Sequence, residues 1–123
     1  MAKVGNHLLI VFMGAILGAA LRLSSEWGLV IAFGMAPKYS LAVVNAFGCG
    51  AFAYCAALLT QQKLTLFWLT GCWGAYTSFS ALSLVFLLME ASSFQVVFYV
   101  MLSALSWGVS FALGQQLARF VMR

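Results

Sequence analysis

Residues 64–89 read LTLFWLTGCWGAYTSFSALSLVFLLM, a run without a charged side chain. A helix needs ~20 predominantly apolar residues to cross the hydrocarbon core of a bilayer, and this run is longer. Its middle, GCWGAYTSFS at 71–80, combines glycines with hydroxyl and aromatic side chains. Such a composition weakens a helix where lipid offers no replacement hydrogen bonds. We therefore expect a membrane-spanning helix that is broken near its middle.

Three more charge-free stretches lie elsewhere in the chain, at Val4–Leu21, Tyr39–Gln62 and Ala91–Ala118. The chain is 65% hydrophobic and 7% charged, whereas an average soluble domain is ~45–50% apolar and ~25% charged. We therefore predict an all-α membrane protein, a single domain over residues 1–123 with four transmembrane helices. Their expected spans are about 7–33, 39–60, 65–90 and 95–120.

Four such spans leave only short connections, which excludes a soluble catalytic, nucleotide-binding or nucleic-acid-binding domain. Membrane flanks account for the net charge of +4 better than a nucleic-acid partner does. Cys49, Cys55 and Cys72 fall inside predicted spans without metal-ligand spacing, so we interpret them as small buried residues. Nothing in the sequence pairs a nucleophile with a base, and we expect no enzyme.

Small residues at helical spacing predict how the spans pack. Gly14 and Gly18 are four residues apart, as are Gly71 and Ala75, and Gly48 lies near several alanines. Such residues let two backbones approach closely where lipid gives no hydrophobic drive for association. They also favour oligomerisation, because four helices cannot easily enclose a pore within one subunit.

Asn45 is an amide inside the second predicted span. An amide without hydrogen-bond partners at this depth is costly, so Asn45 is either a clamp between helices or a ligand. Its depth alone favours the clamp. Its two N–H donors carry no charge, which suits an anion that must be bound and then released.

The hydroxyls of Thr77, Ser78 and Ser80 also have two interpretations. A broken helix would free carbonyl oxygens for a cation and hydroxyls for an anion. Alternatively, the hydroxyls bond back to their own helix, as serine and threonine often do. Phe79 either packs or presents the positive edge of its ring to an anion.

Together these features resemble the small fluoride channels called Fluc or CrcB, in the same order and over essentially the full chain. The matching positions are Gly14, Gly18, Ala19, Arg22, Val44, Asn45, Gly48, Gly71, Gly74, Thr77, Ser78, Phe79, Ser80 and Ser83. The resemblance implies a fluoride-selective channel subunit for passive export of cytoplasmic fluoride, and thus fluoride resistance, in the inner (plasma) membrane. It also implies an antiparallel, dual-topology type dimer of two subunits in the lipid bilayer, with two fluoride pathways and no cofactor besides one central structural sodium ion.

By the same resemblance, the fluoride pathway comprises Asn45, Thr77, Ser78, Phe79, Ser80 and Ser103. The amide and hydroxyls would donate hydrogen bonds, and the phenylalanine would present its ring edge. The backbone carbonyls of Gly74 and Thr77, taken twice across the dimer axis, would be the sodium ligands. Helix packing and the interface would involve Gly14, Gly18, Arg22 and Gly48.

The chain departs from the family pattern at several positions. Leu82 replaces a second phenylalanine, Val85 an acidic residue and Ala75 a glycine. In the fourth span Trp107 and Phe111 replace small or hydroxylated residues. These changes predict a degraded pathway and favour a heterodimer with a paralogue, while a homodimer stays open.

Two other functions compete with a conducting channel. A small multidrug-type exporter needs a buried carboxylate in its first helix, and the candidate is Glu26. Arg22 lies four residues earlier, so an ion pair on one helix face is the better interpretation. The third possibility is a non-conducting assembly subunit of a fluoride channel.

The distribution of basic residues predicts the orientation. With four spans, Lys3, Lys63, Arg119 and Arg123 share one side, opposite Lys38 and at most Arg22. Basic flanks remain cytoplasmic, so a reporter fused to the C-terminus is expected mainly on the cytoplasmic side. Equal insertion in both directions would contradict a fixed orientation and favour a homodimer.

Overall fold

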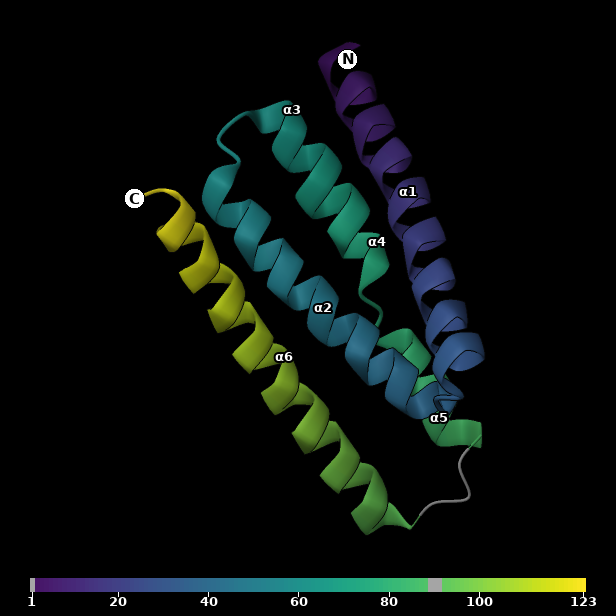
Figure 1. The fold of residues 1–123 in the computed structure, drawn as a ribbon. Helices are drawn as coiled ribbons and strands as arrows, with labels where there is room; N and C mark the ends of the chain where they lie inside the picture. The colour runs from purple at the N-terminus through teal and green to yellow at the C-terminus, as the bar shows by residue number, and fades with distance from the viewer. Residues whose placement is uncertain (1, 89–91) are drawn as a thin grey trace.

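A computed structural model describes residues 2–88 and 92–123, without the side chains of Ala2, Leu82, Val85, Phe86 and Leu88. The described residues form helices and turns and contain no strand. The helices are α1 (Ala2–Phe33), α2 (Pro37–Leu58), α3 (Gln62–Thr65), η1 (Leu66–Trp73), α4 (Gly74–Tyr76), α5 (Ser80–Leu88) and α6 (Ser93–Val121) (Figure 1).

Three of these helices, α1, α2 and α6, are long and apolar enough to cross a membrane. The region of the third predicted span contains α3, η1, α4 and α5 in succession. The predicted end of that span, at Glu90, lies outside the described residues. The structure is therefore that of an all-α membrane protein, and the fourth crossing stays a prediction.

Local sequence signals explain where the long helices begin and end. Gly34 follows the last residue of α1 with φ +62°, a left-handed conformation that a side chain would disfavour. Pro37 occupies the first turn of α2, where a missing N–H costs no hydrogen bond. At the start of α6, Ser92 and Gln95 form a reciprocal capping box.

The η1 segment is wound as a π-helix over eight residues. At its end, the N–H of Gly74 donates to the carbonyl of Leu69, five residues earlier. π-Helical turns are rare and widen the helix locally, and they occur frequently at functional sites. The interruption of the third helical region follows after the single turn of α4.

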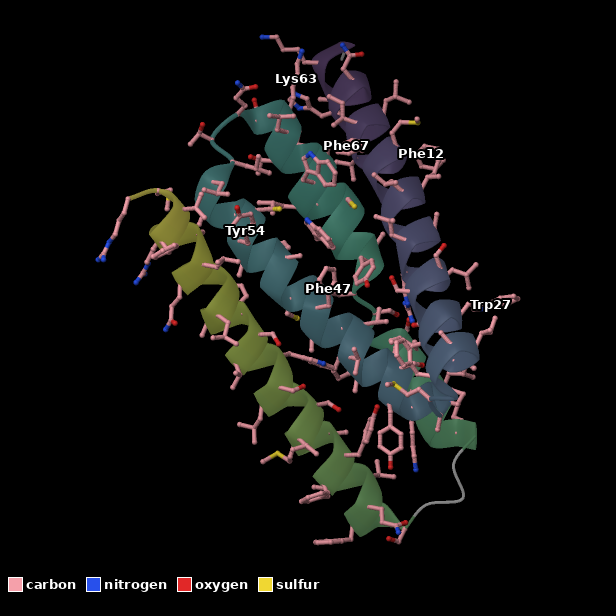
Figure 2. All side chains as sticks on the ribbon, viewed as in Figure 1. Phe12, Trp27, Phe47, Tyr54, Lys63 and Phe67 are labelled. Atoms are coloured by element: carbon pink, nitrogen blue, oxygen red, sulfur yellow. The ribbon has the colours of Figure 1, made fainter. Side chains whose placement is uncertain are left out.

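The helices form two closely packed pairs, α1 with η1 and α2 with α6. Figure 1 shows η1 and α4 between α1 and α2, with α6 on the far side of α2. The N-terminus and α3 lie at one end of the molecule, and the side chain of Lys63 lies there as well (Figure 2). The turn between α1 and α2 lies at the opposite end, beside α5.

Glycines bring the backbones of each pair into contact. A Cβ atom on Gly18 would lie 2.0 Å from the carbonyl oxygen of Cys72, and one on Gly14 would lie 2.2 Å from that of Phe67. In the other pair, a Cβ on Gly114 would lie 2.1 Å from the carbonyl oxygen of Gly50. Real Cβ atoms are not found at such distances, so the two pairs depend on these glycines.

The outer faces of the helices are apolar and uncovered. Phe12 and Trp27 are 62% and 64% exposed and project away from the bundle on α1 (Figure 2). The fully buried side chains are few, and Cys72 is among them. Cys49 and Cys55 are partly exposed, and all three cysteines are free thiols. An exposed apolar surface of this extent suits a lipid bilayer or a second subunit.

Replacing Gly18 by alanine should separate α1 from η1, because the new methyl group overlaps the Cys72 carbonyl. We expect the free energy of unfolding to fall by about 1–3 kcal/mol, as in overpacked cores. Gly28→Ala is the matched control, since a Cβ at Gly28 in the same helix meets nothing within 4 Å. Thermal unfolding in detergent compares the variants, and equal stability would contradict the close contact.

Candidate functional site

The break after α4 is fixed by Asn45 of α2. The helix ends at Tyr76 and the next one begins at Ser80, so residues 77–79 are not helical. Asn45 Nδ2 donates to the Ser78 carbonyl at 3.2 Å, and the Ser78 N–H donates to Asn45 Oδ1 at 3.0 Å. Asn45 is 2% exposed. One side chain therefore satisfies both backbone groups of a residue in the break.

Two backbone carbonyls beside the break lose their helical donors. In a continuous helix the N–H of Ser78 would donate to the carbonyl of Gly74, but it donates to Asn45. Likewise, the N–H of Ala81 would donate to the carbonyl of Thr77, but it donates to Ser78 Oγ at 3.3 Å. Because α4 ends at Tyr76 and α5 begins at Ser80, the carbonyls of Gly74 and Thr77 do not receive these helical hydrogen bonds. Gly74 and Thr77 thus have carbonyl oxygens with acceptor capacity for another partner.

The hydroxyl groups of the break have different partners. Thr77 Oγ1 donates back to the Trp73 carbonyl of its own helical turn at 3.1 Å. Ser78 Oγ and Ser80 Oγ share one hydrogen bond at 3.0 Å, in which either is the donor. Two hydroxyls carry two protons, so one proton of this serine pair remains for a further acceptor. The serine pair, unlike Thr77, therefore has a donor to offer.

Phe79 connects the break to α6. Its side chain is 66% exposed, and its ring lies edge-to-face with that of Trp107, with centroids 6.2 Å apart at 76°. The indole Nε1 of Trp107 is buried and has no hydrogen-bond partner among the described residues. This contact between Phe79 and Trp107 was not expected from the sequence.

Ser103 lies in α6 four residues before Trp107, about one helical turn away. It is 3% exposed and accepts a hydrogen bond from Ser106 Oγ to its carbonyl at 2.7 Å. Both serines line a groove between α2 and α6 with Tyr39, Ala42, Val43, Ala46, Tyr99 and Leu102. Ser106 and Ser110 follow Ser103 at helical spacing, and this spacing could have identified the stripe from the sequence.

The charged pair of α1 is formed as expected. Arg22 Nε donates to Glu26 Oε1 at 2.9 Å, and both side chains are partly buried. Glu26 is therefore already paired, unlike the free carboxylate on which an exporter of the small multidrug type depends. Ser25, which directly precedes Glu26, accepts a hydrogen bond from the Tyr76 hydroxyl at 3.1 Å, and this bond joins α1 to α4.

Several predicted site residues are thus adjacent and others are separate. Asn45 contacts Ser78, and Phe79 and Ser80 follow Ser78 in the chain. Gly48 packs against Tyr76 and Thr77. The side chains of Leu82 and Val85 lie outside the described part of the chain. Phe111 of α6 is partly exposed, at 39%.

Comparison with known protein families identifies the chain. The profile of the family described as "CrcB-like protein, Camphor Resistance (CrcB)" matches residues 9–115. The chain belongs to the CrcB family. The family is that of the Fluc/CrcB fluoride channels. No curated protein and no solved structure matched the chain.

Membership of the CrcB family confirms the resemblance found in the sequence. It supports a channel rather than an enzyme, with fluoride as the transported ion at the level of the family. Together with the three long apolar helices, it makes the chain a multi-pass membrane protein. The match includes Asn45, the break and Trp107.

Removing the Asn45 amide should destabilise the CrcB fold. Asn45→Ala leaves the Ser78 N–H and C=O without partners, and each unsatisfied buried group costs about 1–3 kcal/mol. Ser40→Ala is the control, because Ser40 is equally buried but its hydroxyl bonds only to Pro37 in its own helical turn. Thermal unfolding in detergent should show the larger loss for Asn45→Ala, and equal losses would contradict the clamp.

Proposed function

We propose that this chain is a subunit of a fluoride-selective channel, which lets cytoplasmic fluoride leave the cell passively through the inner (plasma) membrane. The observation that carries the proposal is the helix break pinned by Asn45 in a chain of the CrcB family. Irregular backbone at membrane depth is tolerated only when it is buried in protein or lines a cavity. A break that lines an ion pathway meets this condition.

Uncharged donors surround the break. Asn45 uses one amide proton on the Ser78 carbonyl, and its second proton is available to an anion. The Ser78 and Ser80 pair has one spare hydroxyl proton, and Phe79 exposes its ring. Fluoride accepts hydrogen bonds only, so these groups can replace its water. Because none of them carries a full charge, the ion is not trapped.

The complete channel would be an antiparallel dimer. Gly74 is exposed and Thr77 is partly exposed in the single subunit, so a second subunit can approach both. Their carbonyl oxygens lack helical donors, which fits them to a sodium ion between the two subunits. Such an ion would stabilise the break because its positive charge would take the place of the missing N–H donors. Homodimers and heterodimers with a paralogue both satisfy this arrangement.

Fluoride efflux from liposomes tests the proposal. Purified protein in sodium-containing liposomes should release fluoride faster than empty liposomes, without a proton gradient. Asn45→Asp should lower the rate at least about tenfold, because it exchanges a donor for a negative charge that repels the anion. Replacing sodium by potassium during reconstitution should also lower the rate.

Each arm has a contradicting outcome. Absence of fluoride release from unmodified protein, alone and with a paralogue, would refute the channel. A rate for Asn45→Asp equal to that of the unmodified protein, with insertion verified, would exclude Asn45 from the pathway. An unchanged rate in potassium would refute the sodium site while leaving the channel standing.

A further inference from the structure

Trp107 on α6 has a hydrogen-bond donor with nothing to bond. Its indole Nε1 is buried, and no acceptor among the described residues lies within hydrogen-bond reach. The indole group is a donor only, so no alternative arrangement of its own proton relieves this state. Buried donors without partners are rare in folded proteins, and they are least tolerated in lipid. Such a donor is available to a ligand, and its surroundings decide whether one can reach it.

The position of the ring gives the place of that ligand. Trp107 packs edge-to-face against Phe79 at 6.2 Å, and Phe79 directly follows Ser78, which Asn45 holds. The indole therefore lies where α6 meets the helix break. The donors of the break come from α2 and from residues 78–80, while Trp107 approaches from a third helix. These donors belong to three parts of the chain, and each lies beside a residue of the segment 78–80 or within it.

The geometry points to Trp107 Nε1–H as a hydrogen-bond donor to fluoride beside Phe79, and this assignment rests on the proposed function. The substitution of Trp107 for a small or hydroxylated residue then adds a donor to the pathway instead of degrading it. An indole N–H has no net charge and cannot accept a proton. It can therefore bind a small anion without holding it as tightly as a lysine or arginine would.

A second tryptophan provides a matched comparison. Trp73 of η1 also has a buried indole nitrogen without a partner among the described residues. Its ring packs against Phe47 and Tyr76, with centroids 6.1 and 5.4 Å away, and not against Phe79. Trp73→Phe therefore removes the same chemical group from a ring that does not pack against Phe79. If any unpaired indole N–H mattered equally, the two substitutions would have equal effects.

The first test measures fluoride efflux from liposomes with a fluoride electrode. Trp107→Phe keeps an aromatic ring beside Phe79 and removes only the N–H. We expect it to lower the efflux rate about tenfold, the factor that corresponds to losing one hydrogen bond to a charged group. Trp73→Phe should stay within about twofold of the unmodified protein. If Trp107→Phe matches the unmodified protein, or if both variants lose activity equally, the assignment is wrong.

The second test does not depend on transport. The chain has four tryptophans, so protein labelled with 15N in the indole rings gives few signals in an NMR spectrum, and Trp107→Phe identifies one of them. Fluoride should shift the Trp107 signal in proportion to the occupancy of the anion site, while the same concentration of chloride should leave the signal unchanged. A Trp107 signal that does not respond to fluoride overturns the assignment even if the protein conducts.

The two tests separate the failure of this inference from the failure of the channel. Unmodified protein that releases fluoride, together with an unresponsive Trp107, refutes only the indole donor. Protein that releases no fluoride but whose Trp107 signal shifts with fluoride refutes the channel and keeps the anion site. Protein that neither releases fluoride nor shows a shift of its Trp107 signal refutes both the channel and the indole donor.

Discussion

A backbone N–H or carbonyl that is buried without a hydrogen-bond partner is costly, and this constraint governs the arrangement around residues 77–79. The break between α4 and α5 exposes the N–H and the carbonyl of Ser78, and Asn45 satisfies both with a single amide. Because Asn45 belongs to a long regular helix, the position of the break follows from the position of α2. The clamp that the depth of Asn45 favoured is therefore what holds the site in place.

The clamp also connects two halves that are each closed by glycines. In one half, carbonyl oxygens of η1 lie against Gly14 and Gly18, and in the other the Gly50 carbonyl lies against Gly114. Contacts between Cα–H groups and carbonyl oxygens recur at such close helix interfaces. Asn45 crosses from the α2 half to the break. A change in either glycine interface would therefore shift the donors of the site relative to one another.

Hydropathy alone predicted the long helices, since α1, α2 and α6 coincide with three of the four apolar stretches. The pair of interpretations for Asn45 could not be decided from the sequence, because its partner Ser78 is 33 residues away and contacts it only after folding. The π-helical winding of η1 could not be predicted from the sequence either, because its residues would also fit a regular α-helix. The composition of residues 71–80 predicted an interrupted helix, and only tertiary contact revealed that Asn45 bonds to its backbone.

Trp107 shows why comparison by position can mislead. As a departure from the family pattern, the ring at this position led to the prediction of a degraded pathway. In the fold the same ring lies against Phe79, and its N–H is an uncharged donor without a partner among the described residues. The charged residues Arg22 and Glu26 form an ion pair with each other on α1. In the proposed pathway the anion is therefore held by dipoles alone, so its selectivity depends on how rigidly the glycine-packed helices keep those dipoles in position.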